Sequence, residues 1–527
     1  MRCSVPQLLL VFPVLFAIPA EASSPPCATI RRGGPGDVED AAVPPRRPHR
    51  DVDGAVPSHG ASASPPCRAE DAEPARREAP RATRPPASYV CHRSCPGAAH
   101  LFSRRFGDAR EQIGYSVAAD GAGNIVLAGS AAGTVDFGGG PVSAAGAFLA
   151  KLDADGGLLW SRAFDSPSSF ASAVAVDADG SILLAGGFRD PIDLGGGSLM
   201  NPFDGLQISF VAKFDAGGNH LWSRAASGDE RHFPRAIAAD GAGNVLVSGS
   251  FEGSLDFSGG AWPLVSTGGL FDEDVFVSKL DASGDHLWSK GFGTADIDRG
   301  EGLAVDGAGN IVLAGFSLGG GLDFGGRPLP SAGSSDIFVA KLDPDGHHVW
   351  SRSYGDPGSQ NASAVAVDPW GNVLVTGGFT GSVDFGGGPR RSAGDNDAFV
   401  LKLDPRGHHV WSRRLGGALR QDGTAIAADA DGNVAVGGFF RGALELACGR
   451  LESAGQEDVF LIELDADGRA LWGDRFGDAQ SQTPTDVAFD PGGDVLLTGY
   501  FDGVLDFGGG PLAGQGGRDA FLAKLGR

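Results

Sequence analysis

Short apolar runs recur along the chain from about residue 98 onward, and turn-forming residues separate them. One stretch shows the pattern: residues 364–367, 373–379, 398–403 and 409–413 are rich in Val, Ala, Leu and aromatic residues, with DPWGN and DPRG as two of the intervening segments. Gly and Asn in such segments tolerate the positive φ of tight turns. No segment keeps a helical period over ten or more residues. The pattern predicts a four-stranded antiparallel meander.

This meander is repeated about every 61 residues. One marker is a Trp preceded by Leu or Val, at spacings of 62, 66, 62, 61 and 61 residues: Trp160, Trp222, Trp288, Trp350, Trp411 and Trp472. Phe102 stands in the same position 58 residues before the first of these Trp residues. A second marker is an Asp that ends an apolar run, at Asp120, Asp177, Asp240, Asp306, Asp368, Asp429 and Asp490. Both markers count seven repeats.

Seven four-stranded units predict an all-β fold, a closed seven-bladed β-propeller over residues 98–527. The repeat region begins with a fourth strand at residues 100–105 and stops at a third strand, residues 521–525. The N-terminal strand is therefore expected to complete the last blade and close the ring, which hides the edges of the array. An open solenoid is the alternative, and the matched missing strand argues against it.

The first 97 residues have a different composition. Residues 1–22 resemble a signal peptide, with Arg2, an apolar stretch at residues 8–18 and a small-residue cleavage site ending at Ala22. An uncleaved anchor is the alternative, but the apolar stretch is too short to span a bilayer, and no other segment is a transmembrane candidate. Residues 23–97 are rich in Pro, Ala and Arg without a hydrophobic period, which predicts a disordered linker.

The charge distribution and the cysteines limit the kinds of partner and covalent link that we expect for this chain. The formal net charge is −23, and residues 23–97 carry more basic than acidic side chains, so the acidic excess lies in the repeats. A nucleic-acid partner is therefore not expected, because a phosphate backbone needs a basic face. Four cysteines of the linker could form two disulfides in an exported chain, with the pairing open: Cys27, Cys67, Cys91 and Cys95.

Several motifs recur together in each repeat. Residues 304–310 read AVDGAGN, residues 323–326 read DFGG and residues 338–343 read FVAKLD. This combination resembles the bacterial SBBP β-propeller repeat family over residues 98–527. The resemblance implies an exported or surface-associated propeller and assigns no activity. The sixth repeat departs from the pattern, with ELAC at residues 445–448 in place of DFGG and Glu463 in place of the recurring Lys.

Loop lengths predict which face of the ring binds a ligand. The connections between strands 1 and 2 and between strands 3 and 4 are short Asp-Gly turns, whereas the 2–3 and 4–1 connections are long and lie on the opposite face. Propeller ligands are expected where loops are long and variable. The longest connection, residues 253–274, carries Trp262 and Phe271. Together with Trp370, which sits in a short turn, they are candidates for contacts with a sugar or a protein, and local loop packing is the alternative.

One polar cluster is a candidate for catalytic chemistry: Glu230, Arg231 and His232, in a single 4–1 connection.

The residues that recur once in each repeat are interpreted as structural. The periodic Trp residues are expected to fill the core, the Lys of strand 3 to pair with the repeated Asp, and the His two positions before each marker aromatic to be solvated at the start of strand 4. The Asp-x-Asp-Gly turns lack the remaining ligands of a calcium loop. The GFSLG segment at residues 315–319 lacks the helix that a nucleophile elbow needs.

These observations predict an exported, monomeric, non-catalytic propeller that binds a protein or a polysaccharide at the cell envelope or outside the cell. No metal site and no cofactor are expected, with calcium left open. A polysaccharide lyase or hydrolase with its site at the channel mouth is one alternative, and a structural spacer is another.

Overall fold

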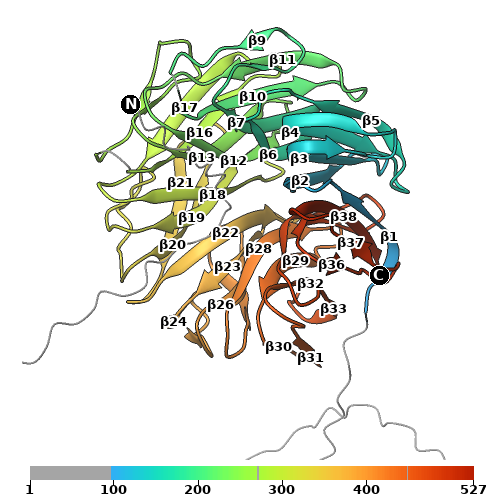
Figure 1. Ribbon diagram of the computed structural model, residues 1–527. Helices are drawn as coiled ribbons and strands as arrows, with labels where there is room; N and C mark the ends of the chain where they lie inside the picture. The colour runs from blue at the N-terminus through green and yellow to red at the C-terminus, as the bar shows by residue number, and fades with distance from the viewer. Residues whose placement is uncertain (1–96, 204, 270–271, 448) are drawn as a thin grey trace, which may run out of the picture. The chain divides into compact units, whose positions relative to one another are not determined.

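The computed structural model describes residues 97–527 except 204, 270–271 and 448. The predicted signal segment, the linker up to residue 96, Phe271, Cys448 and the four linker cysteines lie outside the described residues. The described residues form seven four-stranded antiparallel sheets arranged as blades around a central axis (Figure 1). The predicted seven-bladed β-propeller is confirmed. Within the described part of the chain, no helix has the length and apolar character needed to cross a membrane.

The blades are numbered one to seven by their innermost strands, which lie side by side around the axis: β2 (Gln112–Ala119), β6 (Phe170–Val176), β12 (His232–Ala239), β18 (Asp298–Val305), β22 (Gln360–Val367), β28 (Gln421–Ala428) and β34 (Gln482–Phe489). Their second strands are β3 (Ile125–Val135), β7 (Ile182–Phe188), β13 (Val245–Phe251), β19 (Ile311–Ser317), β23 (Val373–Phe379), β29 (Val434–Phe440) and β35 (Val495–Phe501).

The third strands are β4 (Val142–Leu152), β10 (Ile208–Phe214), β16 (Asp274–Leu280), β20 (Asp336–Leu342), β26 (Asp397–Leu403), β32 (Asp458–Leu464) and β38 (Asp519–Gly526). The outermost strands are β5 (Leu158–Ala163), β11 (His220–Ala225), β17 (His286–Phe292), β21 (His348–Tyr354), β27 (His409–Leu415), β33 (Ala470–Phe476) and, in blade seven, β1 (Ala99–Phe106). Because β1 pairs with β38 from Ala99 opposite Gly526 to Phe106 opposite Ala520, the N-terminal strand closes the ring as expected.

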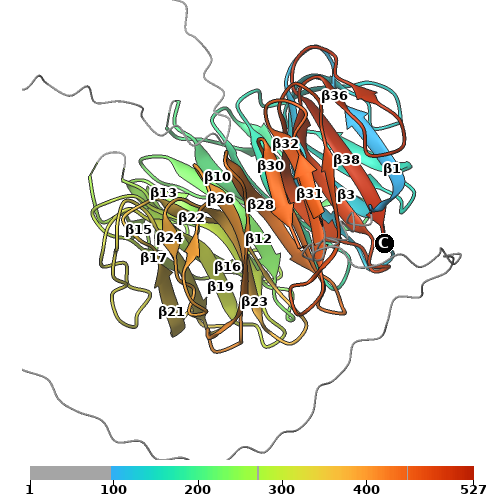
Figure 2. The ribbon, with the colours of Figure 1, turned by 90° about the horizontal axis from the view of Figure 1, so that it is seen from below.

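The connections between strands 2 and 3 hold a feature that the sequence pattern did not predict. Five of them contain a short antiparallel pair: β8 (Ile192–Asp193) with β9 (Ser198–Leu199), β14 (Ser254–Leu255) with β15 (Leu264–Val265), β24 (Ser382–Val383) with β25 (Arg390–Arg391), β30 (Ala443–Leu446) with β31 (Gly449–Glu452), and β36 (Val504–Leu505) with β37 (Leu512–Ala513). Figure 1 shows β9, β24, β30 and β31 at the outside of the ring, and Figure 2 shows the same ring turned by 90°.

The DFGG motif lies in the 2–3 connection of blades one, four, five and seven, and its Phe joins neighbouring blades. Phe385 of blade five lies 5.3 Å, between ring centroids, from Tyr354 at the end of the outermost strand of blade four. It also lies 4.9 Å from Phe399 in its own blade. Phe137, Phe324 and Phe507 make equivalent contacts. The apolar strands 2 and 3 of blades two to seven are buried along their whole length, so the core lies between the blades.

The repeated His residues are half-buried, which corrects the prediction that they are solvated. His409 packs against Gly387 of its hairpin, where a side-chain carbon on the glycine would lie 2.3 Å from the imidazole Cε1 atom. The ring also forms a hydrogen bond with the Ser412 hydroxyl at 3.1 Å. The same His–Ser pair forms at His100, His220, His286 and His348. The glycine of the motif is therefore needed because the imidazole occupies the space above it.

Candidate functional site

The face of the ring that carries the 1–2 and 3–4 turns, called here the short-turn face, is nearly the same in every blade. Lys341 of strand 3 lies 2.7 Å from Asp306 of the 1–2 turn, and both side chains are buried. Asn310 donates a second hydrogen bond to that carboxylate at 2.8 Å. Burial alone would raise the pKa of Asp306, but the hydrogen bonds from Lys341 and Asn310 hold it below its usual value. The predicted pairing of Lys with Asp is confirmed in six blades: Lys151–Asp120, Lys213–Asp177, Lys279–Asp240, Lys341–Asp306, Lys402–Asp368 and Lys524–Asp490.

The opposite face, called here the long-loop face, carries the residues that differ between blades. Each innermost strand has a β-bulge at the same place. The residue at the bulge is of five kinds among the seven blades, with Ser and Thr each found twice: Tyr115, Ser172, Arg235, Glu301, Ser363, Thr424 and Thr485. Because the innermost strands surround the axis, these residues lie at the wall of the central channel. Divergence among otherwise equivalent positions is therefore concentrated around the axis.

A bidentate ion pair joins blades three and four on the long-loop face. Arg299 donates two hydrogen bonds to Glu273, at 2.9 and 2.6 Å, and its guanidinium lies 5.8 Å from the centre of the Phe316 ring. The Ser250 hydroxyl donates to the same carboxylate at 2.6 Å. The bidentate geometry is the strong form of a charge-assisted hydrogen bond. In the channel nearby, Arg235 lies 3.6 Å from Glu301.

Blade six carries a second arginine over an aromatic ring in the same repeat position. Arg420 lies 5.0 Å from the centre of the Phe439 ring and donates to Asp422 at 2.8 Å. Asn396 donates to the other oxygen of Asp422 at 2.7 Å. Burial raises the pKa of Asp422 even though Arg420 opposes the shift.

In blade seven the ring is Tyr500, and Arg518 lies 4.8 Å from its centre and 3.3 Å from Glu111. Three different strands or loops thus bring an arginine to equivalent aromatic positions, Phe316, Phe439 and Tyr500. Blades one, two and five have Ser130, Gly187 and Gly378 there. These arginines are the residues that sequence reasoning missed. An alignment of the seven repeats, inspected for positions that differ between blades, would have revealed them.

Of the predicted cluster, Glu230 and Arg231 lie in the 4–1 connection on the long-loop face, whereas His232 is the first residue of β12 and its imidazole is fully buried. The Nε2 atom of His232 is 2.9 Å from the Ser254 carbonyl oxygen, to which it donates, and Nδ1 accepts from the Ser209 amide at 3.4 Å. Burial lowers the pKa of His232 to about 4. The structure therefore places this His in a structural contact between the connection and β14, with both ring nitrogens occupied.

Trp262 lies on the outer rim of blade three and is 69% exposed. Its indole stacks on the His286 ring with the centroids 6.4 Å apart. Beside it is a pocket of about 330 Å³ whose lining includes Arg224, Asp256 and Asp285. Trp370 is 59% exposed and lies on the short-turn face, with its ring against Gly432 of the next blade. The structure therefore does not bring the two Trp residues together, nor either of them to the channel mouth.

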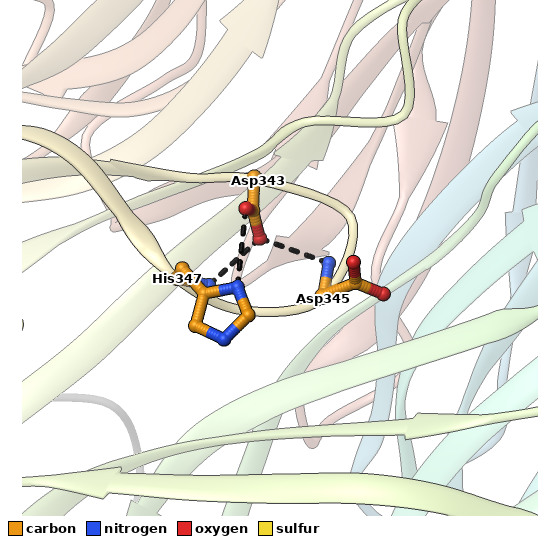
Figure 3. Close-up of side chains that lie close together, drawn as sticks. All are labelled: Asp343, Asp345 and His347. Atoms are coloured by element: carbon orange, nitrogen blue, oxygen red, sulfur yellow. Dashed lines mark hydrogen bonds and ion pairs between the residues drawn. The ribbon is translucent and has the colours of Figure 1, made fainter.

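One group among the described residues has the spacing of metal ligands: Asp343, Asp345 and His347, in the 3–4 turn of blade four (Figure 3). Asp343 accepts hydrogen bonds from the backbone amides of Asp345 and His347, and its other oxygen lies 3.2 Å from the imidazole Nδ1. Blade five repeats the His contact, between His408 and Asp404 at 3.0 Å, with Arg406 in the middle position. Turn chemistry accounts for this arrangement.

No protein-family model matches the chain. An uncharacterized WD repeat-containing protein, L264 of Acanthamoeba polyphaga mimivirus, is 22% identical over 438 residues, which cover 67% of this chain and 31% of that protein. The regulatory protein FlaEY of Caulobacter vibrioides is 30% identical over 173 residues, which cover 31% of this chain and 18% of that protein. The chain thus spans less than a third of the length of either relative.

Among solved structures, YCF48 bound to D1 peptide has a TM-score of 0.40 at 12% identity and covers 82% of this chain and all of that chain. Sqt1 from Chaetomium thermophilum has a TM-score of 0.38 at 12% identity and covers 80% and 86%. The resemblance to SBBP repeats stays a prediction of the sequence. The four-stranded blades and the strand that closes the ring therefore carry the assignment of this chain as a seven-bladed β-propeller.

Proposed function

We propose that this propeller is an exported, non-catalytic recognition module that binds a protein ligand across its long-loop face. The observation that carries the proposal is the contrast between the two faces. The short-turn face repeats one Lys–Asp pair in six blades, whereas the channel wall and the long-loop face carry residues that differ from blade to blade. A face built only to support the ring has no need of such differences, and binding residues are commonly found on loops positioned by a rigid scaffold.

The charges of the long-loop face favour a ligand with basic residues. Some of its arginines are neutralised within the face, as Arg299 is by Glu273, Arg420 by Asp422 and Arg441 by Glu457. Exposed carboxylates remain on its connections, among them Asp165, Asp190, Asp229, Asp296 and Asp395. The whole chain has a net charge of −23, which speeds the association of a cationic partner at low salt.

A polysaccharide-active enzyme is less well supported. The alternative depended on Glu230, Arg231 and His232, and the His232 imidazole has no nitrogen free for proton transfer to a substrate. A general acid or base must reach the proton that it transfers. The rim pocket beside Trp262 offers a stacking surface for a sugar, so glycan binding is the second outcome that a binding screen has to resolve.

The test is a binding screen of the purified propeller, residues 97–527, against two defined sets of probes. One set contains peptides of equal length and hydropathy with net positive, zero or negative charge, and the other contains neutral and acidic polysaccharides. We expect saturable binding to the basic peptides that weakens as salt rises. Binding to a polysaccharide that Trp262→Ala abolishes would overturn the proposed ligand class and place the site on the rim.

Export is part of the proposal and is supported by the signal-like residues 1–22. Expression of the full chain in a bacterial host, followed by N-terminal sequencing of the material outside the cytoplasm, tests it. We expect mature protein beginning at Ser23. Full-length protein confined to the cytoplasm would contradict export without touching the binding proposal.

A further inference from the structure

The residue two positions before the bulge divides the seven innermost strands into two groups. In blades one to three it is large and apolar: Ile113, Phe170 and Phe233. In blades four to seven it is polar: Arg299, Asn361, Asp422 and Thr483. Because β2, β6 and β12 lie side by side (Figure 1), the three apolar residues follow one another around one part of the ring.

The residue that pairs with this position on strand 2 changes in the opposite sense. In blades one to three it is small: Ser130, Gly187 and Ser250. In blades four, six and seven it is one of the three aromatic residues that an arginine covers: Phe316, Phe439 and Tyr500. Blades one to three therefore carry the bulky apolar side chain on the strand nearest the axis, whereas blades four, six and seven carry it one strand farther out.

Contacts with the bulge residues place the apolar side chains at the long-loop mouth of the channel. The Phe170 ring lies 6.1 Å, between ring centroids, from that of Tyr115, the bulge residue of blade one. In blade five, the side-chain amide of Asn361 donates to the hydroxyl of the bulge residue Ser363 at 3.2 Å, so the two positions share one side of the strand. Tyr115, Phe170 and Phe233, called here the apolar arc, are half-buried and so remain partly accessible.

Exposed carboxylates border the apolar arc. Asp165 lies in the 4–1 connection that enters β6, Asp229 in the one that enters β12, and Asp296 in the one that enters β18. Arg235, the bulge residue of blade three, lies 3.6 Å from Glu301, which offsets its positive charge. An apolar centre with an acidic border is complementary to an apolar side chain that has basic residues beside it.

We infer that the apolar arc receives one aromatic or large aliphatic side chain of the protein ligand, and that Asp165, Asp229 and Asp296 hold basic residues on either side of it. This inference rests on the function proposed above and adds the anchor residue of the ligand. Removal of an apolar side chain from water stabilises a complex in proportion to the area buried, and a few such anchors carry most of the affinity of an interface. The polar residues of blades four to seven then face the rest of the ligand.

Three peptides of equal length and charge test the anchor on the full chain. Each carries two lysines on either side of a central residue, which is Phe, Leu or Ser, with Gly and Ser elsewhere. We expect the Phe peptide to bind at least about tenfold more tightly than the Ser peptide by isothermal titration, with the Leu peptide between them. Equal affinity of the three peptides would overturn the anchor and leave the proposed function standing, whereas absence of binding by all three would overturn both.

Two substitutions that introduce residues of other blades locate the anchor. Phe170→Asn introduces the residue of blade five and Phe233→Thr that of blade seven, so the ring already accommodates each side chain at this position. The double variant should bind the Phe peptide no more tightly than the Ser peptide, while its affinity for the Ser peptide stays at the wild-type value. Phe233→Thr alone should weaken the preference for Phe in the same direction, and thermal unfolding verifies that each variant is folded.

The matched control removes apolar surface from the other end of the innermost strands. Val176→Ala with Val305→Ala introduces the residue of blades one, three and six at the short-turn end and should keep the wild-type preference for Phe. A preference that survives in the folded double variant, or that is lost in the control, would contradict the assigned arc.

Discussion

Arg527 donates to the Glu463 carboxylate at 2.8 Å, and this contact takes the place of the Lys–Asp pair in the one blade that lacks the repeated lysine. In blade five, both Lys402 and Trp411 donate to the carbonyl of Ala466, in the 3–4 turn of the next blade. Blade six faces blade seven, whose third and fourth strands come from opposite ends of the sequence and have no turn between them. There Trp472 donates to Glu463 instead, and Arg527 supplies the cation for both Glu463 and Asp429.

Removal of that guanidinium should weaken the closure of the ring. Arg527→Ala leaves two buried carboxylates together without a cation, and because the arginine is 42% exposed we expect a loss of about 1–2 kcal/mol in the free energy of unfolding. Urea unfolding followed by Trp fluorescence measures it. The double variant Arg527→Ala with Glu463→Gln also removes one of the two unpaired carboxylate charges, so it should recover part of the lost free energy of unfolding. If the single variant is as stable as wild type, the contact does not stabilise the junction between blades six and seven.

The buried Lys–Asp pairs should each contribute more than that. Lys341→Met leaves Asp306 buried beside a neutral side chain, and breaking a buried pair in this way should cost about 3 kcal/mol. Lys290→Met removes the same charge from the outermost strand of blade three and should change stability by less than about 0.5 kcal/mol. Equal effects of the two substitutions on the midpoint of urea unfolding would contradict a specific role for the pair.

The DFGG phenylalanine should be the main side chain that joins one blade to the next. Phe385→Ala opens a cavity between Tyr354 and Phe399, and a buried Phe truncated to Ala costs about 3–5 kcal/mol. Val410→Ala is the control, since Val410 is 48% exposed in the adjoining outermost strand. Thermal unfolding compares the two, and a Phe385 variant as stable as its control would mean that the hairpin tip is not part of the core.

His232 should make the stability of the ring depend on pH. Burial lowers its pKa to about 4, below the value of about 6.5 in the unfolded chain. The unfolded state therefore binds more protons between these values, so the contribution of His232 is full above pH 6.5 and is lost as the pH falls toward 4. His232→Gln introduces the residue of the equivalent position in blades five to seven. The difference in stability between wild type and this variant should change by about 2–3 kcal/mol over that range, and a constant difference would show that His232 does not titrate in this window.

Much of the fold could be predicted because the features that determine it repeat along the sequence. Apolar runs, Asp-Gly turns and the matched missing strand lead directly to seven closed blades. The Lys–Asp pairs were predicted for the same reason, since a polar residue that recurs once per blade has a recurring partner. The hairpins were not predicted, because their strands are only two to four residues long and carry glycine in place of an alternating pattern.

The candidate site was harder because it consists of what does not repeat. Arg299, Arg420 and Arg518 come from different positions of the repeat, and only the folded ring shows that each covers an aromatic residue of one shared position. The prediction for His232 was wrong because its position does repeat. A His beside Glu and Arg suggests acid–base chemistry, yet the equivalent residue faces the protein interior in every blade.

The central claim, recognition through the long-loop face, is tested most directly by removing the same charge from each face in turn. One variant changes the exposed Asp165, Asp190, Asp229, Asp296 and Asp395 of the long-loop face to Asn, and its matched control changes five exposed residues of the short-turn face, Asp155, Asp179, Asp345, Asp431 and Asp467. Affinity for the best basic peptide of the screen is then measured by isothermal titration. The account predicts at least a tenfold loss, about 1.4 kcal/mol, for the long-loop variant alone. Equal losses in both variants, or a loss only in the short-turn control, would contradict it.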